Sequence, residues 1–172
     1  NASLPKSLDT LVLSHNPALD QLPAALLRKL TNLTKLSCSH SSLHEIPNLS
    51  ECWSLKEIRL ASNKIFTLAA ISKKLPLTVE IIDIGHNLIR DAKELDYLLA
   101  FKKLTSLNIR GNLADEAEEE AFLKKAALEL TNLRIFNGRN LKPSNKPGKR
   151  SHAEFRLKPE RANKNTKITF DE

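Results

Sequence analysis

Three histidines stand at equivalent places in the sequence and are the first candidates for chemistry. His15, His40 and His86 occur in the triplets Ser-His-Asn, Ser-His-Ser and Gly-His-Asn. Imidazoles that recur in register could hold a transition metal, but no cysteine or carboxylate repeats with them to complete a set of ligands. We therefore interpret them as polar turn residues, and we expect no metal site and no cofactor.

The two cysteines give no sign of catalytic or redox chemistry. Cys38 and Cys52 form no Cys-x-x-Cys motif, and two cysteines do not make a disulfide framework. We expect Cys38 to act as a small core hydrophobe, and we expect Cys52 and its neighbour Trp53 to pack in the core as well. Because the sequence shows no nucleophile–base pair and no phosphate-binding glycine loop, we predict that the protein is not an enzyme.

A basic segment near the C-terminus is a stronger candidate for binding chemistry. Residues 142–172 hold nine Lys or Arg and four Asp or Glu, a net charge of +5, which leaves +2 of the total +7 for residues 1–141. Clustered cations suit a phosphate backbone, so we predict that this segment contacts RNA. A solubilising or nuclear-targeting tail is the alternative. The residues predicted to bind RNA are Lys142, Lys146, Lys149, Arg150, Arg156, Lys158, Arg161 and Lys164.

A second short signal lies at the end of the same segment. Lys167-Ile168-Thr169-Phe170, followed by Asp171 and Glu172, is similar to the docking motif of protein phosphatase 1 regulators. In such a motif the peptide adds to a sheet edge, so that Ile168 and Phe170 would fill alternate pockets on the partner while Lys167 supplies the basic position. Four loosely defined positions arise often by chance, so phosphatase docking is the alternative function.

The body of the chain, which must position these residues, is built from repeats. The pattern Leu-x-x-Leu-x-Leu-x-x-Asn predicts a short buried strand that ends in a tight corner, where the Asn side chain bonds backbone groups. Successive corner residues are 25, 22, 24 and 25 positions apart, and a degenerate sixth copy covers 133–138. The five copies end at Asn16, Ser41 (in place of Asn), Asn63, Asn87 and Asn112.

This pattern resembles the leucine-rich repeat family. The resemblance covers about residues 4–141. It implies an α/β solenoid with a curved parallel sheet on the concave side and helices and turns on the convex side. We predict a leucine-rich repeat domain with a C-terminal cap over residues 1–141, and a basic extended tail over residues 142–172.

Helices are predicted on the convex side and at the end of the solenoid. Residues 23–30 and 92–101 carry apolar side chains at helical spacing, and 115–130 form a helix with acidic residues in its first turns. The last helix and residues 133–141 resemble the C-terminal cap of intracellular leucine-rich repeat proteins. Proteins with such a cap include the U2 ribonucleoprotein A-prime subunit, the acidic nuclear phosphoproteins and a leucine-rich regulator of protein phosphatase 1.

The concave face is where we expect a protein partner to bind. On each strand the residues between the inward leucines face solvent, and this surface is small, polar and without an aromatic anchor. Binding hot spots favour Trp, Tyr and Arg, so Arg59 and Arg110 are the main candidates. The predicted protein-binding residues are Lys35, Glu57, Arg59, Asp83, Asn108 and Arg110.

These features together predict a non-catalytic adaptor. Its concave face would bind a protein, and its tail would bind RNA in a nuclear ribonucleoprotein particle, such as a ribosome precursor or a spliceosomal complex. The cysteine usage favours a reducing compartment, and we expect the nucleus, including the nucleolus, with the cytoplasm as the alternative. We expect no membrane partner, because no run approaches the roughly 18 apolar residues of a membrane helix. A regulatory subunit of protein phosphatase 1 is the alternative.

Overall fold

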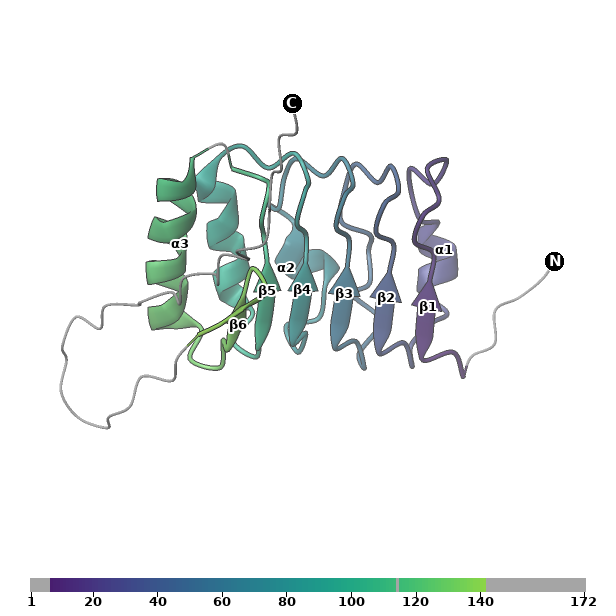
Figure 1. The fold of residues 1–172 in the computed structure, drawn as a ribbon. Coiled ribbons are helices and arrows are strands. Elements are labelled where there is room, and N and C mark those ends of the chain that lie inside the picture. Colours follow the sequence, from purple (N-terminus) through teal and green to yellow (C-terminus); the bar gives the residue numbers. More distant parts are fainter. Residues whose placement is uncertain (1–6, 114, 142–172) are drawn as a thin grey trace, which may run out of the picture.

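The computed structural model describes residues 7–113 and 115–141, which form a solenoid around one seven-stranded sheet. The strands follow one another in chain order, the first six run parallel, and the last returns antiparallel to close a hairpin. Figure 1 shows the strands side by side along one face of the molecule. They are β1 (Thr10–Val12), β2 (Lys35–Ser37), β3 (Glu57–Arg59), β4 (Ile81–Asp83), β5 (Ser106–Asn108), β6 (Ile135–Phe136) and β7 (Arg139–Asn140).

The repeat pattern sets the register of the sheet. The middle residues of the first five strands pair in one row, and from the second strand onward they are at most 1% exposed. Their side chains point into a continuous core, because a single rung has no core of its own and must stack on its neighbours. The paired residues are Leu11, Leu36, Ile58, Ile82 and Leu107.

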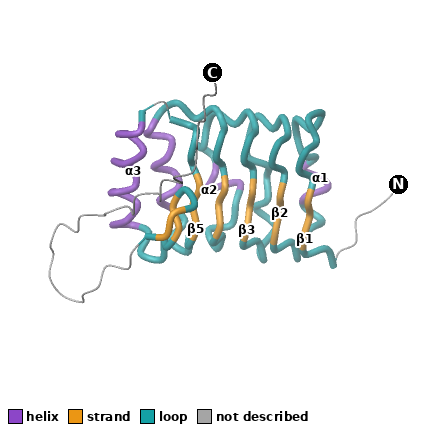
Figure 2. Tube along the Cα trace, in the orientation of Figure 1, coloured by secondary structure: helices purple, strands orange, loops and turns teal. Residues whose placement is uncertain are grey.

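The convex side is made of loops and short helices (Figure 2). Its elements are α1 (Ala24–Leu27), α2 (Ile71–Lys74) and a 3₁₀ helix, η1 (Ala92–Ala100); α3 (Glu116–Glu129) closes the C-terminal end. The predicted helix over 115–130 is confirmed, and Asp115 caps it by accepting a 2.8 Å hydrogen bond from the backbone N–H of Ala117. No helix in the described ranges is long and apolar enough to cross a membrane.

Asparagine side chains hold the corners together, as the sequence predicts. The Nδ2 of Asn87 donates to the carbonyls of Leu60 (3.0 Å) and Ile84 (2.9 Å), and its Oδ1 accepts from the N–H of Ile65 (3.0 Å). Asn63 and Asn112 make the same three types of bond, and all three residues are buried. Each of these corners therefore joins its own rung to the rung before it.

The second corner lacks this link. Ser41 occupies the asparagine position, and its Oγ is buried without a hydrogen-bond partner among the described atoms. A serine hydroxyl is too short to span the distance that the asparagine amide covers. The first two rungs are consequently joined by the sheet and the core but not by a corner side chain.

Two residues differ from the sequence prediction. Trp53 was expected in the core, but it is 70% exposed, because it lies in the turn that leads into β3 and alternates with the buried Cys52 and Leu55. Ser37, expected to face solvent, is only 9% exposed, since its Oγ pairs with the Oγ of Ser14 at 2.8 Å.

Candidate protein-binding surface on the concave face

The residues predicted to bind a protein form one band on the face of the sheet that points away from the core, the concave face. Lys35 and Glu57 are paired across β2 and β3, while Arg59, Asp83 and Asn108 are paired across β3, β4 and β5. Arg110 follows β5 directly. The structure thus brings all six residues together, and we call them the polar band: Lys35, Glu57, Arg59, Asp83, Asn108 and Arg110.

One half of the polar band is an ion-pair triad. The Oε1 of Glu57 lies 3.1 Å from the Nζ of Lys35 and accepts a hydrogen bond from the Nε of Arg59. Burial alone would raise the pKa of Glu57, but the hydrogen bonds from Arg59 and Lys35 outweigh it, so its pKa lies below its ordinary value of 4.5. The triad therefore presents two cations against one carboxylate that stays ionised.

The other half is a hydrogen-bonded pair. The Nδ2 of Asn108 donates to the Oδ1 of Asp83 at 2.8 Å, and this Oδ1 also accepts from the N–H of Gly85 at 3.2 Å. The Oδ1 of Asn108 accepts from the N–H of Arg110, also at 3.2 Å. These bonds fix the carboxylate and the amide before any partner arrives, so less rotamer entropy is lost on binding.

Arg110 differs from the other cations of the polar band. Its side chain is exposed, and the guanidinium group forms no ion pair or hydrogen bond with the residues that the structure describes. Arg59 and Lys35, in contrast, are both held by Glu57. An arginine fork without a carboxylate keeps all its donors for a partner.

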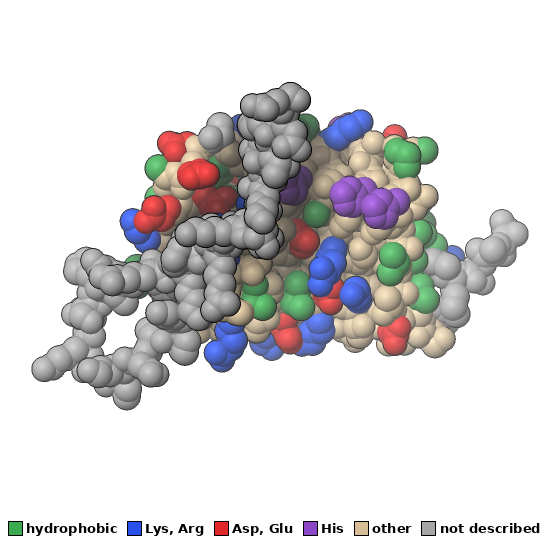
Figure 3. All heavy atoms as spheres, in the orientation of Figure 1, with side chains coloured by type: hydrophobic (Ala, Val, Ile, Leu, Met, Phe, Trp, Pro, Cys, Tyr) green, Lys and Arg blue, Asp and Glu red, His purple; other side chains and the backbone are tan. Residues whose placement is uncertain are grey.

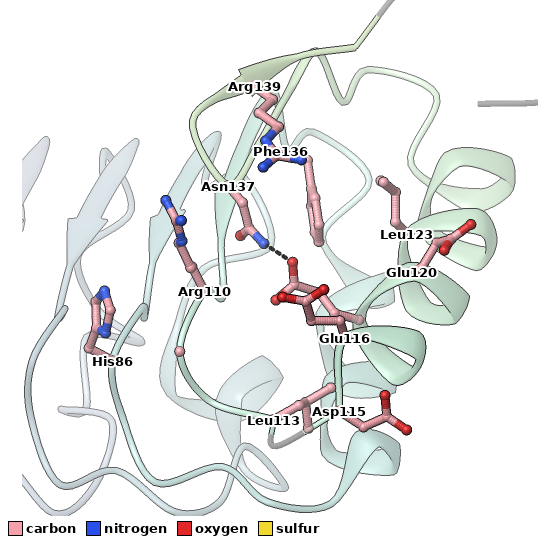
Figure 4. Close-up of a pocket in the computed structure, with 12 residues that line it drawn as sticks. His86, Arg110, Leu113, Asp115, Glu116, Glu120, Leu123, Phe136, Asn137 and Arg139 are labelled. Atoms are coloured by element: carbon pink, nitrogen blue, oxygen red, sulfur yellow. Dashed lines mark hydrogen bonds between the residues drawn. The ribbon is translucent and has the colours of Figure 1, made fainter. Parts of the chain in front are cut away.

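A pocket of about 450 Å³ lies beside Arg110, between the last regular rung and α3 (Figure 4). Leu123 and Phe136 supply apolar surface, and the first turns of α3 supply carboxylates. The Oε1 of Glu119 accepts a 2.5 Å hydrogen bond from the Nδ2 of Asn137, which ties the capping helix to the turn after β6. The lining residues are His86, Arg110, Gly111, Leu113, Asp115, Glu116, Glu119, Glu120, Leu123, Phe136, Asn137 and Arg139.

Of this pocket the sequence predicted only Arg110. The acidic first turns of α3 were recognised as a helix start and not as a wall of a pocket. A signal was present in the chain, because a capping helix must return beside the last rung and thus place its N-terminal turns near Arg110.

The histidines lie on the same face, beside the polar band. Histidine side chains and a group of charged side chains gather there (Figure 3). His15, His40 and His86 are exposed, each with a positive φ between 53° and 63°. They are turn residues, as predicted, and among the described residues no group of three potential metal ligands exists.

Both cysteines are unpaired and fully buried. Burial raises the pKa of Cys38 to about 12; burial, with a smaller contribution from Glu51, raises that of Cys52 to about 11. Thiolates are therefore scarce at neutral pH, and both thiols are shielded from solvent, as expected of small core residues.

The predicted residues of the tail lie outside the described residues. This holds for the RNA-binding set and for the docking motif alike: Lys142, Lys146, Lys149, Arg150, Arg156, Lys158, Arg161, Lys164, Lys167, Ile168 and Phe170.

Comparison with known proteins identifies the architecture. No protein-family model and no curated protein matches the chain. Among solved structures, a leucine-rich repeat protein of Leptospira interrogans superposes with a TM-score of 0.59 at 23% identity, over 76% of this chain and 31% of that one. The chain thus spans less than a third of that protein's length.

Two further structures show the same architecture. A chain of the SNF/U2A′ complex of Drosophila melanogaster has a TM-score of 0.57 at 22% identity, over 77% of this chain and 73% of that one. Internalin C2 of Listeria monocytogenes has a TM-score of 0.53 at 21% identity, over 72% of this chain and 48% of that one. The chain has the leucine-rich repeat fold, and the predicted α/β solenoid is confirmed.

Proposed function

We propose that this protein is a non-catalytic adaptor that binds a protein partner through the polar band on its concave face. The observation that carries the proposal is the position of Arg110, an exposed guanidinium with no ion pair to any described residue, at the end of an otherwise hydrogen-bonded band and beside the pocket of about 450 Å³. Interfaces need such a preorganised surface with one or a few arginine or aromatic anchors.

The chemistry of the band favours a partner with mixed charge. Lys35 and Arg59 are matched by Glu57 and Asp83, so the centre of the band has no net charge. At its end, Arg110 faces a pocket whose other wall carries Glu116 and Glu120 (Figure 4). A partner that offers a carboxylate to Arg110 and a cation to the α3 wall would meet both. The fold likeness to a chain of the SNF/U2A′ complex, solved with a second protein, supports a protein as the partner.

We further propose that residues 142–172 bind RNA in a nuclear ribonucleoprotein particle. The support is the charge partition of the sequence, with +5 of the total +7 in this segment. Such binding is electrostatic, so its affinity should fall as the salt concentration rises. The logarithm of the affinity, plotted against the logarithm of the salt concentration, should have a slope of about −0.7 for each neutralised phosphate.

One set of purifications tests the proposal that the concave face binds a protein. The full chain is used as bait in extracts of the source cells, with and without ribonuclease, beside the double variant Arg59→Ala/Arg110→Ala and the matched control Arg28→Ala on the convex side. We expect a protein partner that survives ribonuclease and is lost from the double variant only. Equal capture by all three baits would overturn the concave-face proposal.

The RNA half is tested separately by titrating labelled single-stranded RNA at several salt concentrations. Deleting residues 142–172 should abolish most of the affinity and flatten the salt slope, while Arg59→Ala/Arg110→Ala should change neither. Unchanged affinity and an unchanged slope after the deletion would contradict the RNA proposal.

The alternative, regulation of protein phosphatase 1, rests on Lys167, Ile168 and Phe170. Replacing Ile168 and Phe170 by Ala should abolish binding of the purified catalytic subunit if these side chains fill its pockets. Binding that persists in this variant would remove the motif's role.

A further inference from the structure

The turns that lead into β2 to β6 form a second regular surface of the solenoid. In each turn a backbone N–H donates to the carbonyl three residues earlier, over 2.9–3.2 Å. The residue before each strand also donates its N–H to the carbonyl of the equivalent residue one rung back, over 2.7–2.9 Å, so the turns are in register. We call this surface, along the lower side of the molecule in Figure 1, the turn edge: residues 31–34, 53–56, 77–80, 102–105 and 131–134.

Two neighbouring turns of this edge expose an apolar side chain at the same position. Trp53 is 70% exposed and Leu77 is 51% exposed, and each is the second residue of its turn. They therefore lie one rung apart, about 5 Å at the usual strand spacing. The same position of the next rung holds Lys102, followed by Lys103. An exposed indole beside cations is the arrangement on which a single-stranded nucleic acid stacks a base while its phosphates are neutralised.

The turn edge is positively charged toward its C-terminal end. Its charged residues are Lys56, Glu80, Lys102, Lys103 and Arg134, four cations against one carboxylate. Glu80 pairs with Lys56 at 2.7 Å, and Glu129 of α3 pairs with Lys102 at 3.1 Å. Lys103 and Arg134 are exposed and form no ion pair with the described residues. Lys and Arg side chains are visible along this side of the molecule in Figure 3.

The segment that we propose to bind RNA begins at this edge. The backbone N–H of Leu141, the last described residue, donates to the carbonyl of Arg134 at 2.7 Å. An RNA strand held by residues 142–172 therefore meets the solenoid beside Arg134.

Charge favours the turn edge over the other surfaces near that point. The lining of the pocket beside Arg110 has four carboxylates against two arginines, a net charge of −2, which repels phosphates. The polar band has three cations against two carboxylates and contains no Trp, Tyr or Phe. The turn edge combines the larger positive charge with an exposed indole.

We propose that the turn edge extends the RNA-binding surface from residues 142–172 onto the solenoid, with Trp53 as the platform on which a base stacks. This inference rests on the proposed binding of RNA by residues 142–172. Arg134 and Lys103 contact phosphates next to that segment, and the strand then reaches Trp53, which lies three rungs from Arg134, about 14 Å at the usual strand spacing. Stacking accepts every base, so the site has no strong sequence preference.

The fluorescence of Trp53 tests the stacking directly, because it is the only tryptophan of the chain. The full chain is titrated with an oligouridine of about 12 nucleotides, and binding is followed independently by the anisotropy of a label on the RNA. We expect the Trp53 fluorescence to be quenched in step with binding. Inorganic polyphosphate, an anion without bases, should compete with the RNA but leave the fluorescence unchanged.

Substitutions separate the stacking from the charge. Trp53→Ala should weaken RNA binding about fivefold or more, whereas Trp53→Phe should retain most of the affinity. Lys103→Ala/Arg134→Ala should reduce the magnitude of the salt slope by about 1.4, or 0.7 for each phosphate contact. The matched control, Lys64→Ala/Lys93→Ala, removes two exposed cations outside the turn edge and should leave the slope unchanged.

Two outcomes would overturn the inference and leave RNA binding by residues 142–172 intact. One is RNA binding without quenching and with equal affinity for Trp53→Ala. The other is loss of a protein partner from the Trp53→Ala bait with unchanged RNA affinity, which would make the turn edge a protein-binding surface. Conversely, quenching and affinity that persist after deletion of residues 142–172 would support the turn edge and contradict the proposal for that segment.

Discussion

Asp83 and Asn87 lie on one rung, four residues apart, and belong to two different regions of the molecule. Asn87 is buried, bonds backbone groups of two rungs, and has counterparts at Asn63 and Asn112. Asp83 is half-exposed and bonds one side chain and one backbone N–H, in a pattern that, among the described rungs, only its partner Asn108 shares. Residues that build the solenoid recur with its period, whereas residues that distinguish this solenoid from others do not.

The first test of this difference between the two regions is Asn87→Ala, for which we expect the largest effect on the free energy of unfolding. The change leaves the buried N–H of Ile65 without its partner, which costs about 1–3 kcal/mol. It also removes one of the two amide donors that bond the carbonyls of Leu60 and Ile84, at about 0.5–1.5 kcal/mol for each bond. The free energy of unfolding in urea should fall by roughly 2–5 kcal/mol.

The matched control is Asn16→Ala, because Asn16 is exposed and its side-chain bonds to described residues stay within its own rung. We expect this variant to lose no more than about 1 kcal/mol. Equal losses at the two corners would show that burial of the corner asparagine is not what stabilises the stack.

Substitutions in the polar band should lower the free energy of unfolding less. Asp83→Ala removes the bonds from Asn108 and Gly85 at a half-exposed site, where water replaces the lost partner, so we expect unfolding to become easier by about 1 kcal/mol. Urea unfolding measures this change beside Asn87→Ala. A loss as large as that of Asn87→Ala would erase the distinction between the two regions.

The defective second corner allows a gain of stability. Ser41→Asn supplies the amide that the other corners use, and we expect it to stabilise the protein by about 1 kcal/mol by bonding the carbonyl of Cys38. Thermal unfolding of this variant is compared with Ser41→Ala, which only removes the unpaired hydroxyl. Destabilisation by Asn would mean that the first two rungs are spaced differently from the rest.

The smallest effect concerns pH and Glu57. Because its pKa is lowered on folding, Glu57 stabilises the protein above its ordinary pKa of 4.5, and this contribution is lost as the pH falls through the lower folded value. We expect wild type to exceed Glu57→Gln in stability by no more than about 1 kcal/mol at neutral pH. The difference should vanish in acid, as urea unfolding over a pH series would show; a constant difference would exclude this ionisation as its cause.

The sequence predicted the repeating part of the structure well, for a physical reason. Inward leucines, corner asparagines and the acidic first turns of the last helix each satisfy a local requirement that a residue type and a spacing express directly. Ser41 was noted as a departure, and it is the corner where the bonding fails.

The parts that the sequence did not predict depend on distant segments. Trp53 was placed in the core because apolar residues usually are, but a turn residue between two inward positions has nowhere to pack. The pocket beside Arg110 needs α3, β6 and β7 together. The left-handed backbone at His15, His40 and His86 could have been inferred, because Gly111 stands at the equivalent position of its own copy and glycine adopts that conformation readily.

The central claim, that the polar band is the partner-binding surface, is tested most directly by labelling arginines with phenylglyoxal in the free protein and in its purified complex. Mass spectrometry then gives the labelling rate of each arginine. We expect Arg59 and Arg110 to be protected in the complex, and Arg28 on the convex side to react at its free rate. Protection of Arg28 with unchanged labelling of Arg59 and Arg110 would contradict the claim.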